Sequence, residues 1–240
     1  MFENYRAKFQ HRNKFIFVPN DEANRRGEII LRFVERTVNF PDNFYHYKSG
    51  GHVAAIHGHL AHSYFFKIDL ERFFYSISRS RVSATLRHFR FGDARDFAKW
   101  SCVRNPYQEG GYALPIGFVQ SPALATLTLM KSPLLPAIAE AERQRTFTSV
   151  YLDDIICSGN DSSVLTSIYH SFLEAIERAS LRAHKLAQPS PNIRAFNCDI
   201  RAGYAAVTAE RIEKFHREGR GAAAEIAFER YCENVSGMNR

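Results

Sequence analysis

The sequence has no apolar run long enough to cross a membrane. No stretch approaches the roughly 18 consecutive apolar residues that a transmembrane helix needs. The start of the chain, MFENYRAKFQHRNKF, also lacks the apolar core of a secretory signal peptide. Neither a membrane protein nor a secreted one is therefore expected, and the sequence predicts a cytoplasmic protein.

Cysteine is scarce and scattered, with no CxxC pair, so neither a zinc knuckle nor a disulfide framework is indicated. The four cysteines are Cys102, Cys157, Cys198 and Cys232. A cluster of histidines without the usual zinc partners and spacings gives only a weak metal signal. These histidines are His52, His57, His59 and His62. Internal repeats and low-complexity tracts are absent as well.

What the chain does have is enough apolar material for one large domain or two small ones. Of its 240 residues, 45% are hydrophobic and 20 are Phe. The formal net charge of +7 and the isoelectric point of about 9.3 are compatible with a polyanionic partner such as a nucleic acid. Moderate basicity also fits a protein without such a partner.

The most informative stretch is Thr148 to Gly159, TSVYLDDIICSG. Asp153 and Asp154 separate two short runs of strand-favouring residues, which predicts a buried hairpin with both carboxylates at its tip. Adjacent carboxylates repel each other unless a cation lies nearby. Mg²⁺ would remove that cost, whereas the simpler interpretation is an ordinary turn, where Asp is common.

A third acid ends another predicted strand. SYFFKIDL, residues 63–70, indicates a buried strand that carries Asp69 near its end. A carboxylate there is costly without a partner. If this strand and the hairpin are neighbours in one sheet, the three acids form the carboxylate set of two-metal phosphoryl transfer, with ions roughly 4 Å apart.

Three basic or glycine-rich segments each allow two interpretations. The arginines and aromatic residues of 79–104 suit a single strand or heteroduplex, or equally a helix pair with an aromatic core. The basic residues of 1–20 form either a backbone-binding arm or a solvated amphipathic segment. Gly50 and Gly51, beside Lys48, form either a phosphate-contacting loop or a plain turn before a helix.

Periodicity and punctuation predict the remaining elements. Helices are expected over 21–38, from about Ser80, and from Ser121, which is a natural N-cap before Pro122. Residues 162–183 predict an amphipathic helix, and AQPSPN at 187–192 a loop. Residues 193–208 are strand-like, and two helices with a break at 219–221 follow.

Three of these elements occur in an order that resembles the reverse transcriptases. FFKIDLERFF, LPIGFVQSP and YLDD are similar to motifs A, B and C of that family, with Lys185 at the place of motif D. The resemblance spans about Phe44 to Ile200. With GGHVAA before motif A and FNCDI after motif D, the chain looks most like the bacterial defence-associated and abortive-infection branch, which is related to retron and group II intron enzymes.

The resemblance implies a metal-dependent RNA-directed DNA polymerase. Asp69 and Asp153 would bind two Mg²⁺ ions, with Mn²⁺ as an alternative, and Asp154 would support the site or the metals. The backbone carbonyl of Leu70 would complete the metal shell. The implied partners are an RNA template, the DNA product, deoxynucleoside triphosphates, and either a partner protein or further copies of the chain. A non-coding RNA is one candidate for the template.

The resemblance also implies nucleotide contacts. Phe74, five residues after Asp69, matches the steric gate that rejects a 2′-hydroxyl. Gly117 and Ser121 would line the nucleotide and template pocket. The two lysines would act at the phosphates, with Lys48 approaching the triphosphate and Lys185 near the leaving pyrophosphate.

Two departures from the family pattern leave alternatives open. Ile116 stands where motif B usually has Gln, and Gln120 follows three residues after Gly117 as its only nearby substitute. About 35 residues follow the palm-like part, which is little for a thumb, so a partner, an oligomer or an RNA would supply that grip. Untemplated or protein-primed synthesis is therefore one alternative, and a catalytically idle RNA-binding scaffold is another.

The expected fold is α+β: a right-hand polymerase palm, meaning an antiparallel sheet backed by helices, with helical fingers and a minimal or absent thumb. The expected fingers comprise 1–62 and an insertion at 79–110. The palm comprises 63–78, with motif A, and 111–205, with motifs B, C and D. Residues 206–240 form a short C-terminal helical segment.

Overall fold

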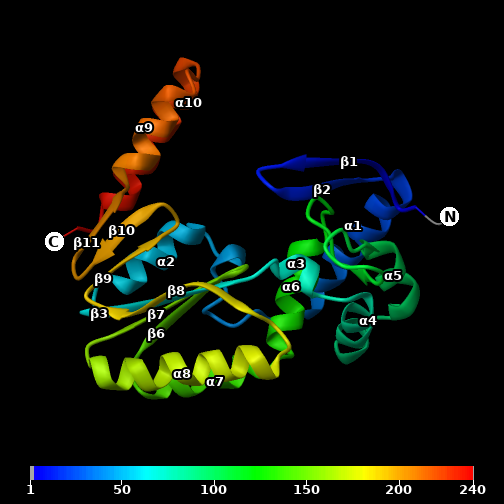
Figure 1. Ribbon diagram of the computed structural model, residues 1–240, viewed down its shortest axis with the longest axis horizontal. Helices are drawn as coiled ribbons and strands as arrows, with labels where there is room; N and C mark the ends of the chain where they lie inside the picture. The colour runs from blue at the N-terminus through cyan, green and yellow to red at the C-terminus, as the bar shows by residue number, and fades with distance from the viewer. Residues whose placement is uncertain (1–2, 240) are drawn as a thin grey trace. The chain divides into compact units, whose positions relative to one another are not determined.

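The computed structural model describes residues 3–239, in two compact units. Unit 1 comprises 3–40, Leu70–Leu135 and Arg178–Leu181. Unit 2 comprises Pro41–Asp69, Pro136–Glu177 and 182–239. Residues 1, 2 and 240, at the ends of the segments predicted as 1–62 and 206–240, lie outside the described residues. Figure 1 labels the elements of both units.

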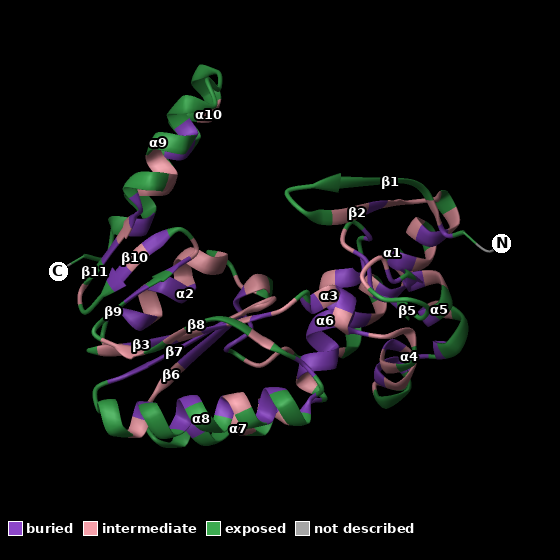
Figure 2. Cartoon of the chain, in the orientation of Figure 1, coloured by how far each residue is buried: buried purple, intermediate pink, exposed green. Residues whose placement is uncertain are grey.

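Unit 1 begins with an antiparallel hairpin, β1 (Tyr5–His11) and β2 (Lys14–Pro19). Its two-residue turn has positive φ at both positions, 47° at Arg12 and 62° at Asn13, as type I′ hairpin turns require. Beyond Tyr5 every residue of β1 is exposed, as its colour in Figure 2 shows. The basic N-terminal segment is thus a β-hairpin in which β1 is exposed and β2 buries Phe17, and its strands were not predicted from the sequence.

Two helices of unit 1 begin at polar residues whose side chains cap the first turn. Asn20 accepts a hydrogen bond from the Ala23 amide at 2.9 Å and starts α1 (Asp21–Thr37), close to the predicted range. Ser78 caps α4 (Arg79–His88) in the same way. The other elements are α3 (Phe73–Ser76), α5 (Ala94–Ser101), α6 (Ser121–Met130) and the strand pair β4 (Val103–Arg104) and β5 (Tyr112–Ala113).

The aromatic residues of 79–104 contribute to the core. Phe91 is 9% exposed and packs edge-to-face on Phe33 of α1 and on Phe97 of α5, with ring centroids 4.8 Å apart in both pairs. These contacts favour the core interpretation for Phe91 and Phe97. Four arginines of the same segment are exposed, namely Arg87, Arg90, Arg95 and Arg104.

The predicted N-cap at Ser121 is wrong by one residue. Gln120 is the N-cap of α6, because its carbonyl accepts the first intrahelical hydrogen bond, from the Leu124 amide at 3.0 Å. Ser121 is therefore the first helical residue, and its buried hydroxyl has no hydrogen-bond partner within residues 3–239. Pro122 still lies in the first turn, where a missing N–H costs nothing.

Unit 2 is built on a four-stranded sheet with the order β6-β7-β3-β8 (Figure 1). The bounds are β3 (Tyr64–Leu70), β6 (Phe147–Tyr151), β7 (Asp154–Gly159) and β8 (Ala183–Ser190). The pairs β6–β7 and β3–β7 are antiparallel. Helices back the sheet, namely α2 (Gly51–His59), α7 (Leu134–Arg143) and α8 (Ser162–Arg178). The predicted antiparallel sheet backed by helices is confirmed.

Alternation along β3 sends neighbouring side chains to opposite faces of this sheet. Phe66 packs edge-to-face on Tyr169 and Phe172 of α8. Phe65 points the other way and joins the apolar cluster that includes Ile56 of α2. Since Lys67 and Asp69 follow Phe65 at intervals of two, they lie on the face that α2 covers.

Unit 2 continues with a three-stranded antiparallel sheet, β9 (Asn192–Ala195), β10 (Cys198–Arg201) and β11 (Tyr204–Val207). Two helices follow, α9 (Ala209–Arg217) and α10 (Ala222–Ser236). The stacked rings of Phe215 and Phe228, 3.9 Å apart, hold these helices together. The prediction of strands followed by two helices with a break near 219–221 is confirmed.

Two predicted boundaries in unit 2 are wrong. Helix α8 ends at Arg178, short of the predicted 183. The predicted loop AQPSPN is largely strand, because β8 runs to Ser190 through Pro189. Proline is tolerated there since β8 is the edge strand of its sheet, where a missing N–H removes no ladder hydrogen bond.

Within residues 3–239, no single helix is both long and apolar enough to span a membrane. Only α6 and α7 taken together, as a bent pair, meet the criteria of length and composition.

Candidate active site

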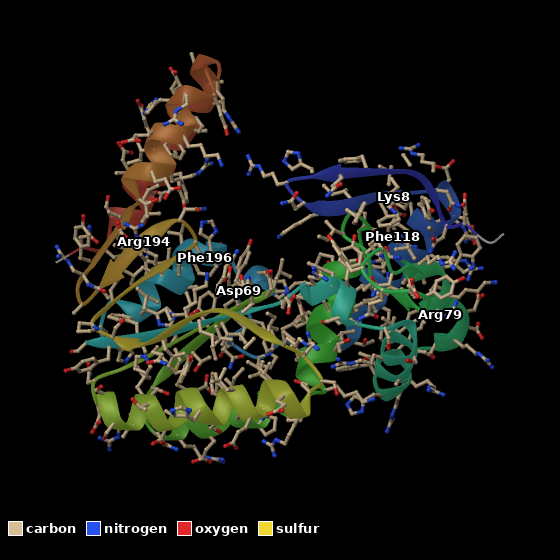
Figure 3. All side chains as sticks on the ribbon, viewed as in Figure 1. Lys8, Asp69, Arg79, Phe118, Arg194 and Phe196 are labelled. Carbon is tan, nitrogen blue, oxygen red and sulfur yellow. The ribbon has the colours of Figure 1, made fainter. Side chains whose placement is uncertain are left out.

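The β3–β7 ladder places Asp69 directly opposite Asp154. Asp69 is the second-last residue of β3 and Asp154 the first of β7, so the two carboxylates are a cross-strand pair on one face of the sheet. Figure 3 shows Asp69 near the end of β3. The strand pairing that the sequence only allowed is therefore present.

The hairpin between β6 and β7 has a two-residue loop. Tyr151 pairs with Asp154, which leaves Leu152 and Asp153 at the tip. Leu152 has a φ of 56°, and a positive φ at the first loop position is the feature of a type II′ turn. Leucine seldom adopts that conformation, so the tip holds a locally strained residue immediately before Asp153.

Asp154 has a cationic partner that sequence reasoning missed. Lys67 Nζ lies 2.5 Å from Asp154 Oδ1, and the side chains are only 15% and 21% exposed. Lys67 shares the sheet face of Asp69 because it precedes Asp69 by two residues on β3. This alternation in SYFFKIDL was the available signal, and it would have placed the lysine beside the acids.

The environment keeps Asp69 from ionising easily. Its pKa is raised, first by partial burial and then by the negative charge of Asp154. Lys67, Lys185 and His184 act in the opposite direction. Burial is the larger of the two effects that raise this pKa, and an added cation would lower the cost of ionising Asp69.

Lys185 lies close enough to Asp69 for its charge to lower the pKa of that carboxyl. It is exposed on β8, the strand that pairs with β3, and has a φ of 45°. The structure thus brings Asp69, Asp154 and Lys185 together, with Asp153 preceding Asp154 in the tip. His184 also reaches Asp69 electrostatically and was not predicted.

The donor set suits a hard divalent cation. Carboxylate oxygens are the ligands Mg²⁺ prefers, and it usually takes one or two of them and leaves its remaining positions to water and phosphate. Across the described part of the chain, no group of three or more His, Cys, Asp and Glu side chains could hold a metal ion. The paired carboxylates of Asp69 and Asp154 fit a hard divalent cation that takes its remaining ligands from water and phosphate.

The four histidines of 52–62 have protein partners. His59 is completely buried and bridges Ser158 and Ser149, with its ring nitrogens 2.7 and 2.8 Å from the two hydroxyls. His62 also meets Ser158, at 2.9 Å. His52 contacts the Tyr231 hydroxyl at 3.2 Å, and His57 the Val235 carbonyl at 3.2 Å. They act as hydrogen-bonding groups that tie α2 to its neighbours.

Lys48 forms an ion pair with Asp42 at 3.1 Å and lies over the Tyr45 ring. The neighbouring Gly50, with a φ of 82°, is the N-cap of α2, and Gly51 begins the helix. This geometry agrees with the interpretation of the glycine pair as a turn before a helix.

The remaining predicted site residues belong to unit 1. Leu70 ends β3 and is 1% exposed. Phe74 lies in the short helix α3, is half-buried, and packs against Phe73. Gly117 has a φ of 110°, and a Cβ there would lie 2.2 Å from the Phe17 carbonyl oxygen. What requires glycine at this position is the close approach of β2.

Gln120 is completely buried in unit 1. Its amide nitrogen donates to the Ser101 hydroxyl at 3.2 Å, and its Oε1 would be 2.3 Å from a Cβ at Gly27. Ser121 is 1% exposed. Both side chains are therefore buried inside unit 1 in this structure.

The sequence model of the family described as "Reverse transcriptase (RNA-dependent DNA polymerase)" matches residues 21–186. No curated protein matches the chain. Among solved structures, a foamy viral protease-reverse transcriptase in complex with an RNA/DNA hybrid is 18% identical, with a TM-score of 0.51 over 87% of this chain and 24% of that one. The same enzyme's dRH form in complex with double-stranded DNA is 20% identical, with a TM-score of 0.49 over 87% and 31%.

The chain therefore spans less than a third of the length of either protein. At this level of identity the first of the two structures supports the fold alone, and that fold is the predicted palm, an antiparallel sheet with helices. The family match covers more than half of the sequence and includes all three acids and Lys185. This chain belongs to the reverse transcriptase family.

Proposed function

We propose that this chain is an RNA-directed DNA polymerase whose nucleotidyl transfer uses two Mg²⁺ ions held by Asp69 and Asp153. The observation that carries the proposal is the pairing of Asp69 with Asp154 beside the two-residue hairpin tip, in a chain of this family. The acids lie on strands of one sheet, which favours a fixed geometry.

When bound, the ions would polarise the phosphoryl oxygens and stabilise the developing charge on the attacking and leaving groups. Asp69 and Asp153 would hold the ions, and the Leu70 carbonyl would add a further oxygen. Asp154 keeps the local charge negative while Lys67 anchors its carboxylate. Mn²⁺ offers the same coordination chemistry as an alternative.

Other residues position the nucleotide in this proposal. Lys185, whose charge acts on Asp69, lies near the leaving pyrophosphate. Phe74 packs against the sugar, and Lys48 approaches the triphosphate after leaving Asp42. The family resemblance assigns nucleotide contacts to Gly117, Gln120 and Ser121, and the side chains of Gln120 and Ser121 are buried in unit 1. The division into fingers (1–62, 79–110), palm (63–78, 111–205) and a C-terminal segment (206–240) belongs to the same proposal.

The proposed partners are an RNA template and a DNA product. The basic charge of the chain supports a polyanionic partner, and a foamy viral relative by fold is in complex with an RNA/DNA hybrid. The resemblance of GGHVAA and FNCDI to defence-associated enzymes motivates a role in bacterial antiphage defence in the cytoplasm, with a non-coding RNA, a partner protein or further copies of the chain completing the duplex grip.

A second candidate is untemplated or protein-primed DNA synthesis by the same site. Two observations favour it: Ile116 stands in the place of the usual motif B glutamine, and Gln120, its nearest substitute, is fully buried. Without that polar contact, the template has less influence on which nucleotide is bound. An idle RNA-binding scaffold is a third candidate, disfavoured because the costly acid pair is present.

The test is to purify the chain with its accompanying nucleic acid, add Mg²⁺ and labelled deoxynucleotides, and sequence the product. Asp153→Ala should abolish synthesis without loss of folding, whereas Asp21→Ala, which removes an exposed carboxylate in α1, should retain it. Product complementary to a co-purified RNA supports templated synthesis, and product without a matching template supports the second candidate. Activity retained in Asp153→Ala would contradict the metal assignment.

A further inference from the structure

A small cavity in unit 1 is lined by three cations and by no carboxylate. It has a volume of about 340 Å³ and lies among α4, the end of α6 and the segment that follows α8. Arg81, Lys131 and Arg178 supply the charge, and the other lining residues are neutral Ala, Thr, Ser and Pro. Like charges gathered around one space repel each other unless a counter-ion is bound there.

Arg81 is the cation whose position is least explained by ordinary packing. Its guanidinium is half-buried, and burial alone lowers its pKa, with no acidic group acting against that effect. Nη1 is buried and has no hydrogen-bond partner within residues 3–239. A buried charge without a partner is costly, so a site that keeps one is suited to an anionic ligand.

The helix dipole disfavours the charge of Arg81 and favours the charges of the other two cations. Lys131 is the C-cap of α6 and Arg178 the last residue of α8, where the helix dipole favours positive charge. Arg81 instead lies in the first turn of α4, three residues after its N-cap Ser78. There the dipole disfavours a cation and favours an anion. An anion in the cavity would resolve this conflict.

Two of the hydroxyls around the cavity, those of Thr128 and Ser132, are already engaged. Thr128 Oγ1 donates to the Leu124 carbonyl at 2.8 Å, and Ser132 Oγ donates to the Leu129 carbonyl at 2.7 Å. Lys131 Nζ makes one hydrogen bond, to the Ala84 carbonyl at 3.3 Å, and keeps donors in reserve. The three cations are therefore the main groups that can bind a ligand in this cavity. They suit a phosphate group better than an uncharged sugar.

The charge pattern distinguishes this cavity from a second one in unit 1. That larger cavity, of about 810 Å³, has basic residues such as Arg87 and Lys99, but it also contains Asp93 and Asp96. These two carboxylates place negative charge beside its cations, which the smaller cavity does not have. In the smaller cavity the three cations form no ion pair within the described residues.

We propose that the cavity of Arg81, Lys131 and Arg178 binds a small phosphate-bearing molecule, with its phosphate held between the three cations. The volume is at the lower end of the roughly 300–1,000 Å³ of small-molecule sites. Three cations around one space fit one phosphate group, whereas a polynucleotide strand would need a row of cations. This site goes beyond the proposed polymerase activity and does not depend on it.

The test is calorimetric titration of the full chain with inorganic phosphate, without Mg²⁺ or deoxynucleotides, against chloride at equal ionic strength. Lys131→Gln and Arg178→Gln remove exposed cations and leave Arg81 in place. Each should weaken phosphate binding about fivefold or more, the loss of about 1 kcal/mol of charge attraction. Arg87→Gln removes an exposed cation on α4 outside this cavity and should bind phosphate as the unmodified chain does.

Two results would overturn the proposal. The first is phosphate binding that is no stronger than chloride binding. Phosphate binding that Arg87→Gln weakens as much as Lys131→Gln does would count in the same way. The second is a short RNA whose binding needs Lys131 and Arg178 while phosphate does not bind, which would assign the surface to a polynucleotide. Because no synthesis is measured, failure here is independent of the polymerase assay.

Discussion

Asp69 of β3 faces Asp154 of β7 across the last pair of their antiparallel ladder. A sheet rarely gains from two carboxylates in register, since directly opposed like charges destabilise strand pairing. Lys67, whose Nζ lies 2.5 Å from Asp154 Oδ1, offsets part of this repulsion. Burial first, and then the negative charge of Asp154, still raise the pKa of Asp69. The acid pair thus lowers the stability of the free chain, which is expected where a cation completes a functional site.

Asp69→Asn should therefore stabilise the metal-free chain at neutral pH, by up to about 1 kcal/mol, the scale of one cross-strand pair. Because the pKa of Asp69 is raised above 3.8, the folded chain keeps this proton to higher pH than the unfolded chain. Its contribution to stability is therefore lost as pH rises through the raised pKa. Urea unfolding of both proteins at a series of pH values measures this difference, which should grow above pH 4.

The same variant tests the metal. Mg²⁺ should raise the unfolding midpoint of the unmodified chain, because a ligand that binds only the folded state stabilises it. Asp69→Asn should lose most of that response. An equal response to Mg²⁺ in both proteins would show that the ion binds elsewhere.

Lys67→Met should destabilise the metal-free chain by roughly 1–3 kcal/mol, between the values for exposed and buried ion pairs. Removing Lys67 leaves Asp154 unpaired and takes away a charge that lowers the pKa of Asp69. Mg²⁺ should recover more stability in this variant than in the unmodified chain. Lys67→Arg keeps the charge and is the matched control. If both variants lose stability equally, packing rather than charge accounts for the role of Lys67.

The sequence predicts those parts of this site that depend on local patterns along the chain. It does not predict the parts that depend on contacts between distant segments. The strand ending at Asp69 and the hairpin around Asp153 follow from local patterns of apolar and turn residues. Register is a tertiary property, so the Asp69–Asp154 pairing could only be hypothesised. The position of Lys67 follows from the alternation of side chains along β3, which places it on the same sheet face as Asp69. The predicted site did not include Lys67.

Other differences have similar causes. A strand through Pro189 contradicts the local signal of AQPSPN, yet it is allowed because β8 ends up at a sheet edge. The sequence predicts Gln120 as a polar group near a ligand, and the packing of α1 through Gly27 buries it in the structure. Polarity in a sequence cannot by itself distinguish a buried amide from one that faces a substrate.

His59 should make the chain sensitive to acid. Its complete burial lowers its pKa to about 3, so below about pH 6.5 the unfolded chain binds a proton there that the folded chain does not. Stability is therefore lost as pH falls from 6.5 towards 3, on the order of 4 kcal/mol. The raised pKa of Asp69 acts in the opposite direction.

His59→Gln, which keeps hydrogen-bonding groups near Ser149 and Ser158, should remove most of this acid dependence, even if it lowers stability at pH 7. Unfolding free energies at pH 7, 6, 5 and 4 provide the comparison. Parallel curves for the two proteins would assign the acid sensitivity to other groups, such as His46, whose pKa burial lowers to about 4.

Gly117→Ala should destabilise unit 1 more than a positive φ alone explains. At Gly117, with a φ of 110°, the added Cβ would lie 2.2 Å from the Phe17 carbonyl oxygen, whose residue donates its amide to the Ile116 carbonyl at 2.9 Å. Backbone strain costs roughly 1–3 kcal/mol, and the clash adds to it because β2 must move. We expect a loss above about 3 kcal/mol, measured by urea unfolding.

Gly111→Ala is the matched control for this substitution. Gly111 also has a positive φ, 78°, but a Cβ there meets nothing within 4 Å. Its loss should be about 1 kcal/mol, the strain alone. The difference between the two variants isolates the contact of β2 with the segment before α6. Equal losses would mean that β2 yields freely, and the glycine at 117 would then have to be explained by a ligand that approaches the backbone there.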